Sequence, residues 1–172
     1  MNRVFALCGK IGSGKSHIAE KISKEYNGII FSADKIMLKL FGEIDGRGLF
    51  EEKYGICKEM IYEISENILE NTNGNIIFDF GFWTKKGRNE VKERFKKFKV
   101  IFIYIKTDDD TRWKRIEKRN KENKIDNYYF DRETFDFLSN LFEEFCEGEE
   151  YILFEDIKQL IGEINQIRGG QG

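Results

Sequence analysis

The sequence contains no proline, a single histidine and only three cysteines among its 172 residues. The cysteines Cys8, Cys57 and Cys146 are odd in number and form no CxxC pair, which argues against a disulfide framework and a zinc site. No apolar run approaches the length of a membrane span, and no secretory signal follows Met1. We therefore expect a protein that works in a reducing cytoplasm and does not enter a membrane.

An excess of positive charge is also missing. Lys and Arg total 29 against 31 Asp and Glu, so no overall field favours nucleic acid, although a local basic cleft is compatible with this balance. Hydrophobic residues make up 40% of the chain, enough for one domain with a core. We expect a single domain over residues 1–168, as a monomer or dimer, and a disordered tail at residues 169–172.

Short apolar runs alternate with amphipathic segments along the chain. The apolar runs predict strands at Val4–Cys8, Gly28–Phe31, Asn75–Phe80, Lys99–Ile105 and Tyr151–Phe154. Helical periodicity predicts helices at Lys15–Tyr26, Ala33–Phe41, Glu51–Asn71, Thr84–Lys97, Asp108–Asn123, Arg132–Glu144 and Ile157–Ile167. This alternation predicts an α/β fold with a five-stranded parallel sheet covered on both faces, and ligands at the carboxyl ends of its strands.

One segment matches the phosphate-binding motif GxxxxGK[ST] at every position, between a predicted strand and a predicted helix. Its glycines let backbone N–H groups curl around an anion, and the helix N-terminus adds partial positive charge. We expect a bound nucleotide to contact Gly9, Ile11, Gly12, Ser13, Gly14, Lys15 and Ser16. Lys15 would reach the β- and γ-phosphates, and the Ser16 hydroxyl would coordinate Mg²⁺.

His17, the only histidine, directly follows this motif. One interpretation is contact with the nucleotide near its α-phosphate or base, so we include His17 among the nucleotide-binding candidates. The interpretation that we favour is a helix residue with one edge in solvent, because a general base here would lie on the wrong side of the γ-phosphate.

Other proteins that use this loop carry motifs that the chain lacks. A GTPase needs DxxG and NKxD, whereas Asp79 is followed by Phe80, Gly81 and Phe82, and the sequence NKEN at 120–123 has no aspartate. The DFG at 79–81 has no HRD or VAIK partner, so it does not indicate a protein kinase. A large ATPase motor needs a longer chain. A small phosphotransferase remains.

A phosphotransferase needs a carboxylate opposite the loop, and the sequence FSADKI supplies Asp34 after the second strand. Asp34 would accept the proton of an acceptor hydroxyl or hold the acceptor in line with the γ-phosphate. An ordinary acid in a first helical turn, with Ser32 as the cap, is the alternative. Asp79 ends the third strand in the pattern of a carboxylate that holds Mg²⁺ and borders the acceptor.

Residues after the third predicted strand and on the helix after the fourth strand are further candidates. Phe82 and Trp83 would form an acceptor wall, with core packing as the alternative, and Arg88 would bind an anion of the acceptor. On the charged helix after the fourth strand, three arginines share one face, where we expect at least one to contact phosphate: Arg112, Arg115 and Arg119.

These segments together resemble the small P-loop kinases of the nucleotide-kinase type, and most of all the subgroup of chloramphenicol phosphotransferase, the zeta toxins and the 5′-kinase domain of polynucleotide kinase. The similarity covers about residues 3–154. It implies a sheet order of 2-3-1-4-5, ATP with Mg²⁺, and a mobile helical lid that we place at about residues 107–129. It also implies acceptor activation by Asp34 and phosphate contacts from Arg115 and Arg119. The resemblance further implies that residues 42–54 help to shape the acceptor pocket, although these residues and His17 depart from the pattern of the subgroup.

The favoured hypothesis is a kinase that uses ATP and Mg²⁺ to phosphorylate a hydroxyl group of a small molecule. A kinase of polynucleotide 5′ ends or of nucleotides is an alternative, for which a basic groove would come from Lys92, Arg94, Lys96, Lys97 and residues 118–124. A regulatory module that binds a nucleotide without transferring phosphate is the third hypothesis.

Overall fold

The computed structural model of the chain describes residues 2–44, 47–122 and 128–169. The strands are β1 (Arg3–Cys8), β2 (Gly28–Phe31), β3 (Asn75–Gly81), β4 (Lys99–Tyr104) and β5 (Ile152–Leu153). The helices are α1 (Lys15–Tyr26), α2 (Ala33–Phe41), α3 (Arg47–Asn71), α4 (Lys85–Arg94), α5 (Asp109–Glu122), α6 (Arg132–Asn140) and α7 (Ile157–Gly169).

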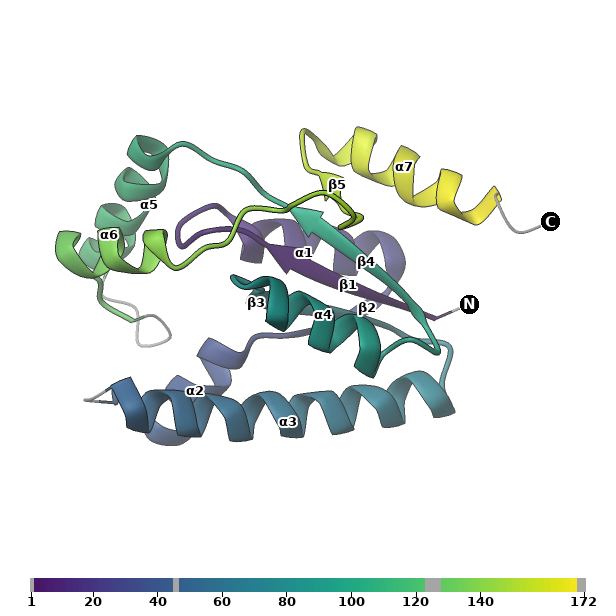
Figure 1. The fold of residues 1–172 in the computed structure, drawn as a ribbon, viewed down its shortest axis with the longest axis horizontal. Helices are drawn as coiled ribbons and strands as arrows, with labels where there is room; N and C mark the ends of the chain where they lie inside the picture. The colour runs from purple at the N-terminus through teal and green to yellow at the C-terminus, as the bar shows by residue number, and fades with distance from the viewer. Residues whose placement is uncertain (1, 45–46, 123–127, 170–172) are drawn as a thin grey trace.

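The five strands form one parallel sheet in the order β2-β3-β1-β4-β5 (Figure 1). β1 lies in the centre, where Val4 pairs with Ile76 of β3 on one side and Val100 of β4 on the other. All six residues of β1 are buried, as expected for a strand covered on both faces. The α/β class and the strand order predicted from the sequence are both confirmed.

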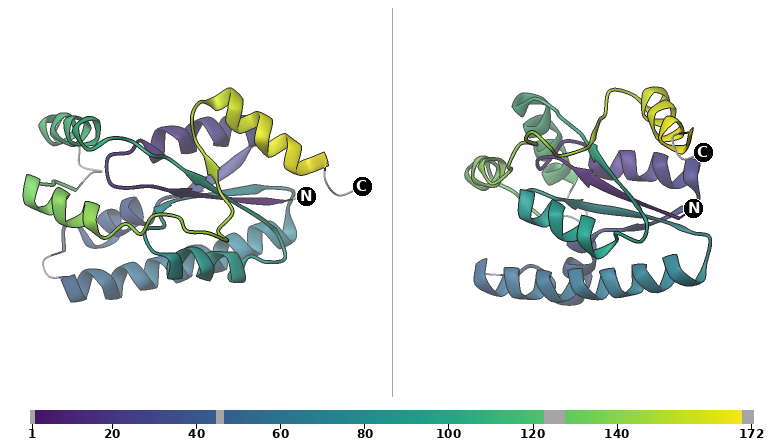
Figure 2. Two further views of the ribbon diagram at one scale, coloured as in Figure 1. Left: turned by 45° about the horizontal axis from the view of Figure 1, so that its top comes forward. Right: turned by 45° about the vertical axis from the view of Figure 1, so that its right-hand side comes forward.

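Two hydrophobic cores lie on opposite faces of the sheet, which gives the molecule three layers (Figure 2). One core joins the sheet to α1 and α7 through residues such as Ile22 and Leu160. The other joins it to α3 and α4 through Tyr62, Val91 and Phe95. The side chains therefore alternate between the two cores along each central strand.

A smaller third cluster joins α5 and α6 to the phosphate-binding loop (the P-loop). It consists of Ile11 from that loop, Ile116 from α5 and Phe135 from α6. The two helices thus form a lobe beside the carboxyl edge of the sheet (Figure 1). This lobe includes the described part of the segment predicted as a lid, whose residues 123–127 lie outside the described ranges.

Several element boundaries differ from the sequence prediction, and α4, for example, ends at Arg94 rather than Lys97. α3 begins at Arg47 rather than Glu51, because an ion pair and a stacked ring pair, both at i,i+4 spacing, extend the helix by one turn. α6 ends at Asn140 rather than Glu144: the chain then runs along the sheet, where the N–H of Glu143 donates to the Trp83 carbonyl at 2.7 Å. β5 keeps only two residues.

The C-terminal residues complete the description of the fold. α7 extends to Gly169, and residues 170–172 of the predicted tail lie outside the described ranges. Within residues 2–44, 47–122 and 128–169, none of the helices has the length and hydrophobicity that crossing a bilayer requires.

A buried ion pair fixes α4 to the segment before β5. Arg88 is 1% exposed, and its guanidinium donates to both carboxylate oxygens of Glu149 at 2.7 and 3.0 Å. It also donates to the carbonyls of Phe82 and Glu143. Hydrogen bonding from Arg88 lowers the pKa of Glu149 to about 2. The positive charge of Arg88 is therefore neutralised by the carboxylate of Glu149.

We predict that Glu149→Gln lowers the free energy of unfolding at pH 7 by about 3 kcal/mol, because it leaves the buried Arg88 charge without its partner. The pKa of Glu149 is depressed in the folded state, so the stability from this pair is present above about pH 4.3 and is lost as the pH falls towards 2. Urea unfolding at several pH values measures both effects. Equal stability of Glu149→Gln and the exposed control Glu150→Gln would contradict the prediction.

Candidate functional site

The P-loop connects the end of β1 to the start of α1, and its glycines are required by backbone geometry. Gly9 has φ 148°, and a Cβ there would lie 2.6 Å from the carbonyl oxygen of Ile105. Gly12 has φ 77°, and a Cβ there would lie 2.8 Å from the carbonyl oxygen of Arg112. Both positions combine a left-handed φ with close backbone contact, so only glycine fits.

Every carbonyl oxygen from residue 9 to residue 13 accepts a hydrogen bond from a side chain. The bonds are Lys15 Nζ to Gly9 and Lys10 (2.9 Å each), Arg112 Nη1 to Ile11 (2.9 Å), Arg115 Nη1 to Gly12 and Ser13 (3.3 and 2.8 Å), and Thr107 Oγ1 to Ser13 (3.1 Å). The N–H groups of Gly9 and Ser13 donate to the carbonyls of Gly81 and Lys10, and we expect an anion to be bound by the other N–H groups of the loop.

The start of α1 lacks the acceptors that a helix N-terminus normally finds in its own chain. Its N-cap residue is Gly14, which makes no side-chain cap. The Ser13 hydroxyl is buried and has no hydrogen-bond partner among the described residues. A phosphate group would satisfy both sets of donors, so the residues present fit a nucleoside triphosphate.

Ser16 and Asp79, which the sequence proposes as metal ligands, meet in the structure. The Ser16 hydroxyl donates to Oδ2 of Asp79 at 2.6 Å, although 62 residues separate them in the sequence. Asp79 is 7% exposed at the carboxyl end of β3. Hydroxyl and carboxylate oxygens beside a triphosphate cradle are the ligands that Mg²⁺ prefers, so this pair fits the ion.

Asp34 lies in the first turn of α2, directly after β2. The side chain of Ser32, the N-cap residue, makes no capping hydrogen bond. The Asp34 side chain is exposed, and the space that it borders together with Asp79 is called the cleft below. Desolvation by surrounding protein atoms and repulsion from Asp79 raise the pKa of the Asp34 carboxyl to about 6. The positive charges of Lys15 and Arg119 act in the opposite direction. Such a carboxyl changes its charge close to neutral pH.

The three arginines of α5 have different surroundings. Arg112 is fully buried, stacks on Phe135 and pairs with Asp109, so its contact with the P-loop is structural. Arg115 is exposed and lies against the loop through the carbonyl contacts given above. Arg119 interacts electrostatically with Asp34, and its Nε and Nη2 atoms are buried without a partner among the described residues. Arg119 is therefore the arginine available to an anion in the cleft.

The other residues predicted for the site lie outside the cluster formed by the P-loop, Asp34, Asp79 and Arg119, or at its edge. Arg88 is engaged by Glu149, as described above, and we leave it out of the acceptor site. Phe82 is 7% exposed and packs against core rings, so its side chain belongs to the core rather than to an acceptor wall. Trp83 is half-buried, and its indole N–H has no partner among the described residues. His17 is exposed on α1.

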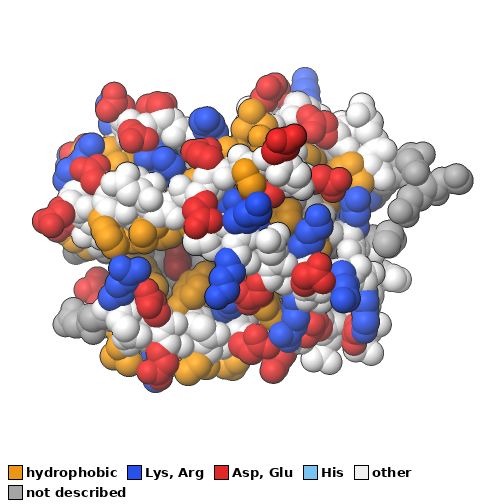
Figure 3. Space-filling model, in the orientation of Figure 1, with side chains coloured by type: hydrophobic (Ala, Val, Ile, Leu, Met, Phe, Trp, Pro, Cys, Tyr) orange, Lys and Arg blue, Asp and Glu red, His pale blue; other side chains and the backbone are white. Residues whose placement is uncertain are grey.

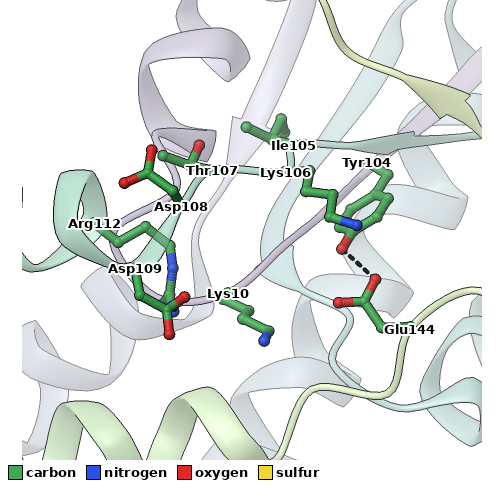
Figure 4. Close-up of a pocket in the computed structure, with 9 residues that line it drawn as sticks. All are labelled: Lys10, Tyr104, Ile105, Lys106, Thr107, Asp108, Asp109, Arg112 and Glu144. Atoms are coloured by element: carbon green, nitrogen blue, oxygen red, sulfur yellow. Dashed lines mark hydrogen bonds and ion pairs between the residues drawn. The ribbon is translucent and has the colours of Figure 1, made fainter.

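A pocket of about 270 Å³ lies on another side of the P-loop (Figure 4). Lys10 belongs to its lining, the Arg112–Asp109 pair closes one side, and a 2.5 Å hydrogen bond from Tyr104 to Glu144 closes the other. Neither Asp34 nor Asp79 lines this pocket. It is therefore distinct from the cleft that holds the two carboxylates.

The sequence did not single out four aromatic residues whose rings contact one another, two of which, Tyr54 and Tyr128, lie within electrostatic range of Asp34. The four are Phe50, Tyr54, Tyr128 and Phe130. They lie in α3 and in the segment before α6, and neither segment carries a recognised motif. The one local signal was the i,i+4 spacing of Phe50 and Tyr54, which also extends α3.

Comparison with protein families gives one match. The profile of the AAA domain family covers residues 4–145, most of the chain. No curated protein sequence is significantly similar to the chain.

Several solved structures share the fold. A candidate kinase from Chloroflexus aurantiacus has a TM-score of 0.75 at 13% identity, with 99% of this chain and 98% of that chain covered. Kti12 of Chaetomium thermophilum in complex with ADP-AlF3 has a TM-score of 0.70 at 12% identity, covering 98% and 99%. A gluconokinase from Sinorhizobium meliloti has a TM-score of 0.66 at 11% identity, covering 99% and 97%. These similarities confirm the predicted P-loop kinase fold.

We predict that Asp34→Asn raises the Tm at pH 8. Because the pKa of Asp34 is raised in the folded state, the stability gained from its protonated form is complete below about pH 4 and is lost as the pH rises through 6. At pH 8 the wild type therefore carries an unfavourable charge that asparagine removes, and the difference in Tm should shrink towards pH 4.

Thermal unfolding at pH 4, 6 and 8 measures the difference. The matched control is Asp110→Asn, which changes an exposed carboxyl on α5 and should show no such pH dependence. A lower Tm for Asp34→Asn at pH 8 would contradict the electrostatic assignment.

Proposed function

The chain belongs to the AAA domain family, and from this premise we propose that it is a kinase that transfers the γ-phosphate of ATP to a hydroxyl group of a small molecule, with Mg²⁺. Its P-loop kinase fold supports nucleotide binding in general. The observation that carries the finer proposal is the charge arrangement opposite the loop. Asp34 lies within electrostatic range of Lys15 and of Arg119, whose Nε and Nη2 atoms make no hydrogen bond among the described residues.

Asp34 would act as the general base. With a pKa of about 6, the carboxylate is mostly ionised at pH 7 yet remains basic enough to take a proton as a bond to phosphorus forms. The acceptor hydroxyl gives its proton to Asp34, its oxygen bonds to the γ-phosphorus, and the bond from that phosphorus to the bridging oxygen of ADP breaks. The products are a phosphate monoester and ADP.

Positive groups on both sides of the reacting phosphoryl group would stabilise its charge. Lys15 is held over the loop by two carbonyl oxygens, and burial lowers its pKa. Arg119, on α5, acts electrostatically on Asp34 as Lys15 does, while Arg115 holds the loop itself. When bound, Mg²⁺ would neutralise charge on the β- and γ-phosphates, and Ser16 and Asp79 would hold it.

The basic residues at the end of α4 and directly after it give little support to a polynucleotide site. Three of the four that were proposed there for a nucleic-acid groove are paired with acids: Arg94 with Glu59 and Glu66, Lys96 with Glu93, and Lys97 with Glu70. A phosphate backbone would have to compete with these carboxylates. The paired charges therefore do not support a nucleic-acid groove on α4.

We predict that Asp34→Asn lowers kcat about 10²- to 10⁴-fold, the usual contribution of a general base, while the Kd for ATP stays close to that of the wild type. Lys15→Ala should instead weaken ATP binding itself, because the loop loses its cation. ADP release in the presence of sugars, nucleosides, aryl alcohols and oligonucleotide 5′ ends measures turnover, and calorimetry measures ATP binding.

Asp110→Asn is again the control, since it makes the same chemical change at an exposed position on α5. Wild-type kcat in Asp34→Asn would refute the assignment of the base. ATP binding without transfer to any acceptor would favour a regulatory nucleotide-binding module instead.

A further inference from the structure

Four aromatic rings form a continuous wall between α3 and the segment that precedes α6. Phe50 and Tyr54 stack on α3 with centroids 6.0 Å apart. Tyr128 meets Phe50 edge-on at 6.1 Å and Phe130 at 6.3 Å. All four residues are half-buried, so this aromatic wall is not closed inside a core.

The aromatic wall borders the cleft that contains Asp34. After burial, the Asp34 charge is the next cause that raises the pKa of both Tyr54 and Tyr128, which places both phenol groups within its electrostatic range. The Arg119 guanidinium packs over the Phe130 ring at 5.3 Å. Figure 3 shows a hollow between the α5–α6 lobe and the α2–α3 hairpin, with hydrophobic side chains along its rims.

Several polar atoms beside these rings have no hydrogen-bond partner among the described residues. The Tyr128 hydroxyl and the Nε and Nη2 atoms of Arg119 are buried and make no hydrogen bond within the described residues. The Tyr104 hydroxyl, by comparison, pairs with Glu144. Buried polar groups in native proteins are almost always satisfied, so these atoms indicate a ligand that supplies their partners.

We propose that the acceptor is an alcohol that carries a flat aromatic or heteroaromatic ring, which stacks on the aromatic wall while its hydroxyl meets Asp34. This inference rests on the proposed kinase function and names its substrate class. A ring matches the apolar faces of Phe50 and Tyr54. A polyol, by contrast, has no flat apolar face to stack on these rings.

The charge of the cleft restricts this ring alcohol further. Asp34, Asp79 and Glu43 all lie within electrostatic range of the wall tyrosines, and Arg119 is the cation among the described residues next to the rings. A neutral alcohol avoids the repulsion that an anionic acceptor would meet from these carboxylates. Nucleosides and aryl alcohols both satisfy these conditions.

Saturation-transfer NMR tests the proposal without turnover. The protein is saturated with Mg²⁺ and a non-hydrolysable ATP analogue to fill the nucleotide site, and the probes are thymidine, 2-phenylethanol, glucose, gluconate and myo-inositol. We expect signals from the ring protons of thymidine, 2-phenylethanol or both, and which of them binds distinguishes a nucleoside from an aryl alcohol. We expect no signals from the three polyols.

Phe50→Leu should weaken binding of the ring probes about tenfold, because it removes one stacking face, whereas Phe50→Tyr should retain it. Phe137→Leu, which changes an exposed ring on α6, is the matched control and should bind like the wild type. Tyr128→Phe should keep ring stacking while weakening the binding of probes that bond to its hydroxyl.

Binding of the polyols in place of the ring probes, or unchanged ring binding in Phe50→Leu, would overturn this inference. Phosphorylation of gluconate or glucose by a protein that ignores ring alcohols would overturn it and leave the kinase proposal standing. Ring binding that depends on Phe50, without phosphate transfer to any acceptor, would leave the wall as a ligand site and refute the kinase proposal.

Discussion

The site depends on side chains that hold the carbonyl groups of the P-loop. Donors from α1, from α5 and from the segment after β4 bind five successive carbonyl oxygens, which fixes the loop in a conformation suited to bind an anion through its remaining N–H groups. Because Arg112 and Arg115 both come from α5, the same helix that carries Arg119 into the cleft also fixes the loop. The position of the proposed catalytic cation and the shape of the phosphate cradle are therefore coupled.

The sheet places two carboxylates of different character at its carboxyl edge. Asp79, at the end of a central strand, is buried and accepts a hydrogen bond from Ser16, which suits a metal ligand. Asp34 follows the edge strand β2, stays open to the cleft and has a raised pKa, which suits proton transfer. Two neighbouring carboxylates with different surroundings often take different roles in catalysis, here metal binding and proton transfer.

The sequence predicted the fold well because hydrophobic period and the P-loop motif are local signals. It also predicted that Ser16 and Asp79 would share one site, since parallel strands end at the same edge. It could not predict that Arg88 would meet a buried glutamate, or that the Phe82 ring would enter the core, because both depend on packing between distant segments. Residues 42–54 were expected to help shape the acceptor pocket, but no motif singles out Phe50 among them, because its contact with Tyr128 depends on packing between distant segments.

The central claim is that the protein transfers phosphate to a hydroxyl group rather than to water. The most direct test is ³¹P NMR of the wild type with ATP, Mg²⁺ and each acceptor in turn. We expect loss of the γ-phosphate signal, with ADP and a new phosphate-monoester signal appearing in equal amounts. Inorganic phosphate as the only new signal with every acceptor, or no loss of ATP at all, would contradict it.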